Sequence, residues 1–214
     1  MRINVYSDKF SGTLSAAEVL KTVTSVFKDV DIQANYFPVT DGGEHSTQIL
    51  KHYNMQTEMI TMTRDFIGNW IPVEYLNVDN DIYFESASLI GVNNTSDHPF
   101  NLDTSALAEV IPNIDVLSLG GSRTVDGGVG LMSSLGIEFY REENIITNPK
   151  PRDFKDITAV KIADSFAKLE LRVLTDTSIP LLGSNSAIAT YGPQKGLNKK
   201  DIKYLEEQLE RIYD

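Results

Sequence analysis

The N-terminal part of the chain twice passes from strand spacing to helix spacing, each time through a loop that contains glycine. Apolar and polar residues alternate over residues 1–5, which predicts a strand, and after DKFSGTLS the apolar residues of 19–27 fall on one helical face. Ser15 and Glu18 have the capping-box spacing that begins a helix. A second expected strand, 32–39, leads through TDGGEHSTQIL into a second expected helix. Two successive β-loop-α units predict the opening of a parallel α/β sheet.

An aspartate follows each of these two strands, at a position where α/β proteins bind ligands. Asp8 comes after the first strand and Asp41 after the second. Ligands of parallel sheets collect at the carboxyl ends of the strands, so neighbouring strands would turn both carboxylates toward one crevice. Asp is also a common turn and cap residue. Both interpretations, a shared site and two separate turns, remain open at this point.

The pattern changes after Tyr53 and indicates a second region. Residues 57–89 alternate apolar and polar side chains and carry turn signals at IGN and VDND, which is typical of antiparallel strands. We therefore expect a domain boundary that divides the chain into 1–56 and 57–214. The last segment, 198–214, predicts an amphipathic helix. Its apolar face carries Ile202, Leu205, Leu209 and Ile212.

Composition and charge argue against several classes of function. The 214 residues include no cysteine, which excludes disulfides, thiolate metal sites and a thiol nucleophile. The net charge of -11 argues against nucleic acid as a partner, because a polyanion needs a basic surface. The N-terminal residues lack the apolar core of a signal peptide, and no apolar run approaches a membrane span, so we expect a cytoplasmic protein without a membrane partner. A small phosphate ligand bridged by Mg²⁺ is compatible with this charge.

Three loops, DGGE, GGSRTVDGG and GPQKG, combine glycine with residues that can contact phosphate or magnesium. Phosphoryl transfer needs backbone N–H groups around the oxygens, an Asp for Mg²⁺ and a Lys for the moving group. The candidates are Asp41 and Asp126 for the metal or a substrate hydroxyl, Lys195 for phosphate, and Ser122 and Thr124 as hydroxyl donors. Each residue alone is more often a turn residue or a solvated side chain. The sequence has no Walker loop, dinucleotide fingerprint, nucleophile elbow or zinc motif.

The order of these motifs resembles the type-1 glycerate kinase family. That family carries DSFKGSLSA, DGGEGT, GGSATNDGG, NPLLG and FGPQKG, and this chain has SDKFSGTLSA, DGGEHST, GGSRTVDGG, IPLLG and YGPQKG in the same order. The resemblance implies a two-domain α/β fold: an incomplete flavodoxin-like parallel α/β domain and a mixed α/β domain with antiparallel strands. It also implies transfer of the γ-phosphoryl group of ATP to a hydroxyl of D-glycerate, with Mg²⁺.

The motif positions that match give the expected site. The catalytic residues that the resemblance implies are Asp8, Asp41, Asp126 and Lys195. The residues expected to contact substrate or phosphate are Lys9, Ser11, Gly12, Gly42, Gly43, Glu44, Glu85, Gly120, Gly121, Ser122, Arg123, Thr124, Gly127, Gly128 and Gln194. The expected metal ligands are Asp41, Asp126 and Asp176.

Several motif positions depart from the family pattern. Ser11 stands where the family has Lys, although Lys9 is two residues earlier, and Val125 and Ile179 replace Asn. Arg123 replaces a small residue, and His45 interrupts the second motif. Glycine preserves backbone shape, whereas a lost amide or ammonium removes a hydrogen-bond donor. Two functions therefore remain open: an active glycerate kinase, and a non-catalytic relative that binds a small anion or a protein partner.

The length of the chain also departs from the pattern of that family. Family members continue past GPQKG with GAGAAGG and GEG segments, whereas this chain ends one helix after that motif. A sheet of two β-α units keeps both outer edges exposed. We therefore expect a shortened or truncated member that associates with a second copy, as a homodimer, or with a complementing C-terminal fragment.

Overall fold

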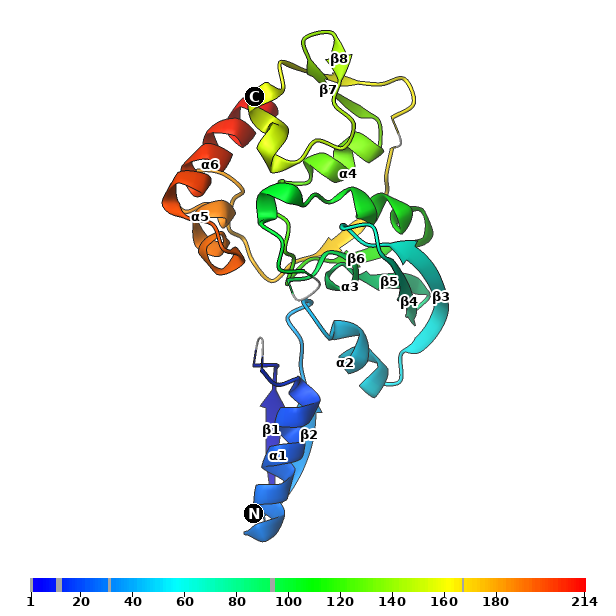
Figure 1. The fold of residues 1–214 in the computed structure, drawn as a ribbon. Helices are drawn as coiled ribbons and strands as arrows, with labels where there is room; N and C mark the ends of the chain where they lie inside the picture. Colours follow the sequence, from blue (N-terminus) through cyan, green and yellow to red (C-terminus); the bar gives the residue numbers. More distant parts are fainter. Residues whose placement is uncertain (1, 11–12, 31, 93–94, 167) are drawn as a thin grey trace.

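The computed structural model describes residues 2–10, 13–30, 32–92, 95–166 and 168–214 as a mixed α/β protein (Figure 1). The strands are β1 (Arg2–Ser7), β2 (Gln33–Pro38), β3 (Gln56–Arg64), β4 (Trp70–Val78), β5 (Asp81–Glu85), β6 (Val116–Ser118), β7 (Ile137–Arg141), β8 (Asn144–Ile145), β9 (Ala159–Ile162) and β10 (Arg172–Leu174). The α-helices are α1 (Ala16–Asp29), α2 (Ser46–His52), α3 (Ala87–Ile90), α4 (Val129–Ser134), α5 (Ala187–Tyr191) and α6 (Lys199–Tyr213). Short 3-10 helices are η1 (Pro99–Asn101), η2 (Ser105–Glu109), η3 (Ile111–Asn113), η4 (Pro151–Asp156) and η5 (Pro193–Lys195).

The first unit of the chain is β1–α1–β2, which extends away from the rest of the molecule (Figure 1). β1 and β2 pair in parallel, which confirms the expected β-α opening. The hydroxyl of Ser15 accepts the N–H of Glu18 while the carboxylate of Glu18 accepts the N–H of Ser15, so the predicted capping box begins α1. α1 buries Ala16 and Leu20.

A five-stranded mixed sheet, in the order β10-β6-β5-β4-β3, forms the centre of the molecule. The strands β3, β4 and β5 are antiparallel, as the alternation after Tyr53 predicts, and β5, β6 and β10 are parallel. One cluster of buried residues packs on the sheet and includes Val73, Tyr75, Phe84, Leu89, Leu102, Val110 and Leu117. A smaller cluster of Leu76, Tyr83 and Val116 contacts Leu50 of α2.

A third layer combines the antiparallel sheet β8-β7-β9 with α4, α5 and α6. Its core includes Val129, Phe139, Phe154, Ile188, Leu205 and Leu209. The predicted amphipathic C-terminal helix is confirmed as α6, which Asn198 caps and whose Leu205 and Leu209 are fully buried.

The expected class, a mixed α/β fold with parallel and antiparallel sheets, is confirmed. The packing of α2 on the five-stranded sheet joins part of segment 1–56 to the second region, and the boundary at residue 56 stays a prediction. In the described ranges, no helix has the length and apolar character that crossing a bilayer requires.

Candidate active site

Two of the glycine loops cross each other in direct backbone contact. A Cβ placed on Gly120 would lie 2.8 Å from Cα of Gly43 and 3.0 Å from its nitrogen. A Cβ on Gly121 would lie 2.8 Å from the side chain of Glu44, and the φ of 63° at Gly121 also favours glycine. Since these distances are far shorter than ordinary contact, only glycine permits the approach. The DGGE and GGSRTVDGG loops are therefore parts of one site.

Lys9 and Asp41 form an ion pair after the ends of β1 and β2. Nζ of Lys9 donates to Oδ1 of Asp41 at 2.7 Å, and the N–H of Gly43 donates to the same oxygen at 2.8 Å. Burial opposes the charged form of each group, but the hydrogen bond and opposite charge outweigh it, so the pKa of Lys9 is raised and that of Asp41 is lowered. Asp8 accepts the backbone N–H of Lys9 at 2.6 Å. Asp8 and Asp41 thus both accept a hydrogen bond from Lys9, Asp8 from its backbone and Asp41 from its side chain.

Glu85 supports the DGGE loop from the end of β5. Its side chain is buried, and its carboxylate accepts the N–H of His45 at 3.0 Å and that of Thr47 at 2.8 Å. These bonds satisfy backbone donors at the start of α2, which otherwise have no partner within the helix. Glu85 therefore positions the loop, and its expected contact with substrate stays a prediction.

Glu44 presents a carboxyl group beside the second glycine loop. Its Oε1 is buried and has no hydrogen-bond partner in the described part of the chain. Burial raises the pKa of Glu44, although the positive charge of Lys9 opposes the change. The rise in pKa reflects the cost of burying a charged carboxylate whose Oε1 has no partner in the described part of the chain.

The backbone of the GGSRTVDGG loop is held open by a neighbouring segment. Two hydrogen bonds of 2.8 Å join 121–123 to 90–92 in an antiparallel bridge. This bridge turns the N–H of Ser122 to the opposite side, and within the described ranges neither this group nor the N–H of Gly120 has a protein acceptor. Unpaired donors in a glycine loop are the usual means of binding an anion.

Two residues that depart from the family pattern in this loop have structural partners. Nη2 of Arg123 donates to the carbonyl of Asp97 at 3.2 Å, while its buried Nε has no partner among the described residues. Val125 is buried and packs in the cluster of α4 and α6. The side chain that replaces an amide thus packs in the core and presents an apolar surface to the cavity described below.

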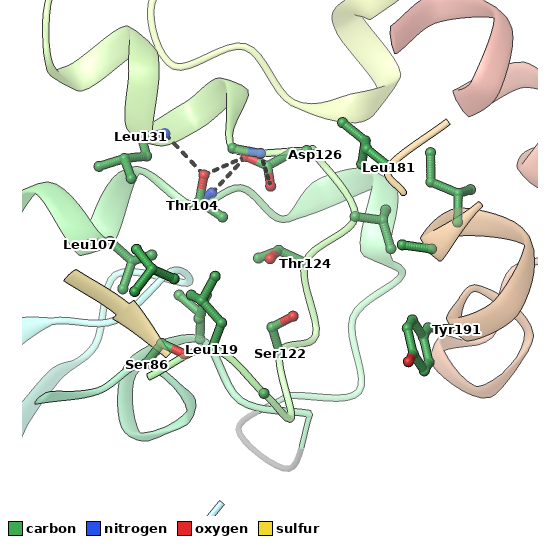
Figure 2. A pocket seen from close by; sticks show the side chains of 18 of the residues that line it. Ser86, Thr104, Leu107, Leu119, Ser122, Thr124, Asp126, Leu131, Leu181 and Tyr191 are labelled. Carbon is green, nitrogen blue, oxygen red and sulfur yellow. Dashed lines mark hydrogen bonds between the residues drawn. The ribbon is translucent and has the colours of Figure 1, made fainter. Parts of the chain in front are cut away.

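Asp126 is buried and its carboxylate is already engaged by the protein (Figure 2). Oδ2 accepts the N–H of Thr104 at 2.9 Å, its hydroxyl at 2.7 Å and the N–H of Gly130 at 2.9 Å. Burial raises the pKa of Asp126, and these hydrogen bonds oppose the rise. The carboxylate therefore ties the loop to η2 and α4, an arrangement that suits a structural role better than the predicted catalytic and metal-binding ones.

Lys195 connects the GPQKG loop to the GGSRTVDGG loop. Its Nζ donates to the carbonyl of Thr124 at 2.8 Å and to the hydroxyl of Ser122 at 3.2 Å. Burial lowers the pKa of Lys195 to about 8, although the negative charge of Asp126 opposes the change. At neutral pH the ammonium group is still mostly protonated, so it can contact a phosphate.

A cavity of about 450 Å³ lies beside this group (Figure 2). Its apolar wall includes Leu107, Leu117, Leu119, Leu131, Leu171 and Ile188, and its polar residues include Ser86, Thr104, Ser122, Thr124, Tyr191 and Lys195. Ser86 is fully buried, and its Oγ has no partner in the described ranges. Ser86, Thr104 and Tyr191 are not among the site residues predicted from the sequence, although Tyr191 begins the motif YGPQKG. Ser86 directly follows Glu85 in FESAS, whereas no sequence signal marks Thr104.

A second cavity, of about 590 Å³, is lined by Asp41 and Asp176 together with Gly42, Tyr83 and Arg172. Mg²⁺ in phosphoryl-transfer sites is held by one or two carboxylates and by substrate phosphates. Asp41 and Asp176 fit this requirement, whereas Asp126 lines the first cavity. Among the described residues, no three acidic or histidine side chains gather as a metal cluster.

The other residues that the sequence predicts for the site are Gln194, Gly127, Gly128, Ser11 and Gly12. Gln194 is exposed and lines neither of these two cavities. Gly127 and Gly128 have φ values of 63° and 89° and turn the chain into α4, a conformation that favours glycine. Ser11 and Gly12 lie outside the described residues.

A family model and several known proteins match this chain in sequence. A sequence model described as the glycerate kinase family matches residues 3–214. A glycerate kinase of Neisseria meningitidis serogroup B is 24% identical over 100% of this chain and 62% of its own length, and one of Halalkalibacterium halodurans is 27% identical over 97% and 59%. A glycerate 2-kinase of Escherichia coli K12 is 25% identical over 98% and 59%.

The fold is similar to that of a glycerate kinase 2 from Salmonella typhimurium LT2, with a TM-score of 0.67 and 23% identity over 99% of this chain and 61% of that one. The chain spans about three fifths of the length of these relatives. The family match covers nearly all of the sequence, and the loops that carry the motifs meet in one site. The chain belongs to the glycerate kinase family.

Proposed function

We propose that this chain contributes the phosphate-binding site of a glycerate kinase, which transfers the γ-phosphoryl group of ATP to a hydroxyl of D-glycerate. The observation that carries the proposal is the meeting of three glycine loops around unpaired backbone donors and Lys195. Relatives of this chain are named glycerate kinases, and that family implies ATP as phosphate donor.

The residues divide into those that would hold phosphate and those that would hold the acceptor. The N–H groups of Gly120 and Ser122 and the ammonium of Lys195 would bind phosphate oxygens. Asp41 and Asp176 would hold Mg²⁺, and the bound cation would neutralise charge that develops on the phosphate. Lys9 keeps Asp41 ionised, so that its carboxylate can hold the cation or accept the hydroxyl of glycerate.

A second candidate is a non-catalytic relative that binds a small anion or a protein partner. It is favoured by Asp126, whose carboxylate serves internal hydrogen bonds, and by Val125, which is buried in the core. In that case the unpaired N–H groups would bind an anion without turnover.

The experiment is an ADP-release assay with Mg·ATP and D-glycerate on the chain and on Asp41→Asn. We expect turnover by the chain, and loss of turnover in the variant with little change in the free energy of unfolding. Asp79→Asn, in an exposed turn, is the matched control and should keep full activity. Binding of Mg·ATP without turnover would support the second candidate, and equal activity in Asp41→Asn would remove Asp41 from the mechanism.

We also propose a cytoplasmic location for this chain. For its partners we propose either a second copy or a complementing segment that completes the β1–β2 sheet, in which Tyr6 is largely exposed; Phe10, just beyond β1, is also largely exposed.

A further inference from the structure

The cavity of about 450 Å³ beside Lys195 has a largely aliphatic wall (Figure 2). Leucine and isoleucine side chains reach it from four elements: Leu107 of η2, Leu117 of β6, Leu131 of α4 and Ile188 of α5. Leu119 lines the same cavity and is 38% exposed, so a ligand can approach this wall from solvent. A dry apolar cavity of about 150 Å³ is large enough for benzene, so this one has room for a longer hydrocarbon chain.

Within the described ranges, Lys195 has one N–H group left for a ligand. An ammonium group carries three N–H donors. Nζ of Lys195 uses two of them, on the carbonyl of Thr124 at 2.8 Å and on the hydroxyl of Ser122 at 3.2 Å. Among the described residues, no carboxylate forms an ion pair with Lys195. A partly buried cation without a counter-charge is unfavourable, and an anionic head group bound at Nζ would offset that cost.

The charged side chains around Lys195 permit an anion at this position. The charges of Asp126 and Arg123 both reach Lys195, and they are of opposite sign. The carboxylate of Asp126 accepts the N–H groups of Thr104 and Gly130, so protein donors already stabilise its negative charge. The positive charge of Arg123 favours an anionic ligand.

The part of the wall that Val125 forms offers no hydrogen bond. Val125 lines the cavity at the position where the family motif has Asn, so two methyl groups replace an amide. The hydroxyls of Thr104 and Ser122 have protein partners, whereas the Oγ of Ser86 has none in the described ranges. Polar groups of a ligand would lack partners along most of this wall, whereas a hydrocarbon chain gains free energy by leaving water. The cavity therefore favours a ligand that is anionic at one end and apolar along its length.

We propose that this cavity binds a carboxylic acid with an aliphatic chain of about six carbon atoms, with its carboxylate on Lys195 and its chain against the aliphatic wall. The inference rests on the proposed function only in the use of Lys195 as an anion-binding group, and it does not require turnover. A carboxylate at Nζ would occupy the position proposed for phosphate. The acid would therefore compete with Mg·ATP and regulate the same site.

The test compares three probes that separate the head group from the chain: hexanoate, acetate and hexan-1-ol. Each is titrated into the folded chain labelled with ¹⁵N, and the amide shifts of the GGSRTVDGG loop are followed by nuclear magnetic resonance. Each methylene that enters the cavity should tighten binding by up to about fourfold, so hexanoate should bind more tightly than acetate. The contact of the carboxylate with the ammonium should make hexanoate bind about tenfold more tightly than hexan-1-ol.

Two variants change the head-group contact and the wall separately. Lys195→Met keeps an apolar stem without the charge, so it should weaken hexanoate binding about tenfold and leave the affinity for hexan-1-ol unchanged. Leu119→Asn should weaken hexanoate binding about threefold to tenfold and leave the affinity for acetate unchanged. Leu169→Asn is the matched control, because Leu169 is also 38% exposed but does not line the cavity. It should leave all three affinities unchanged.

Several results would overturn the proposal. They are the absence of hexanoate binding to the folded chain, equal affinities for hexanoate and hexan-1-ol, and equal affinities for hexanoate and acetate. If Lys195→Met does not fold, the comparison of the three probes on the wild type decides the question. A parallel titration with Mg·ATP separates this inference from the proposed function. Binding of Mg·ATP without binding of hexanoate would overturn only the present inference, and binding of hexanoate without binding of Mg·ATP would support it and contradict the kinase function.

Discussion

Gly120→Ala tests the crossing of the two glycine loops. The added Cβ would lie 2.8 Å from Cα of Gly43, whereas carbon atoms in contact are about 3.5–4.0 Å apart, so the loops must separate by about 1 Å. Gly120 does not have a positive φ, so alanine suits its backbone, and the smaller entropy of the unfolded chain would by itself stabilise the variant by about 0.4–1 kcal/mol. Overpacking against backbone costs about 1–3 kcal/mol. We therefore expect a net loss of about 1–2 kcal/mol.

The assay is urea unfolding with an unchanged m-value, together with titration of Mg·ATP. Gly43→Ala is the matched control: its Cβ would meet Oδ1 of Asp41 at 3.0 Å and Nζ of Lys9 at 3.4 Å, two side-chain atoms that can move. It should therefore be destabilised less than Gly120→Ala. If Gly120→Ala is as stable as the wild type and binds Mg·ATP equally well, the loops do not cross as described.

Three further changes test charge and packing. Lys9→Met removes the ion pair with Asp41, which should contribute about 1 kcal/mol or less at pH 7. Because the pKa of Asp41 is lowered in the folded state, this contribution should be lost in urea unfolding as the pH falls below the ordinary pKa of Asp and through the lowered pKa of Asp41. In the folded chain the pKa of Lys195 is lowered to about 8, so above that pH the unfolded chain binds more protons than the folded one. The free energy of unfolding should therefore rise with pH from there, by at most about 1.4 kcal/mol per pH unit. Lys195→Met should lack that rise, and an equal rise would refute the assignment. Leu209→Ala in the core should cost about 2–5 kcal/mol, against about 0.5 or less for the exposed Lys203→Ala; similar losses would contradict the burial of α6.

Signals within short stretches of the sequence are sufficient to predict the helices and loops in which they occur. The capping box of Ser15 and Glu18 predicts the start of α1 because both partners lie within one helical turn. The apolar spacing of Leu205 and Leu209 predicts the buried face of α6 for the same reason. The motif glycines likewise indicate the loops, since Gly121 has a positive φ and Gly120 has no room for a side chain.

The roles of individual side chains depend on distant partners and could not be predicted. Asp126 looks like a metal ligand in the motif, but Thr104, from a segment that shows no motif, occupies its carboxylate. Glu85 accepts from the backbone of His45, so its charge supports a loop 40 residues away.

The most direct test of the central claim is isothermal titration of the folded chain with Mg·ATP, with and without D-glycerate. We expect a heat of binding that grows when glycerate is present, because the loops around Lys195 and the carboxylates near Asp41 would then hold two substrates in one site. A flat trace from folded protein under both conditions would contradict a working kinase site in this chain.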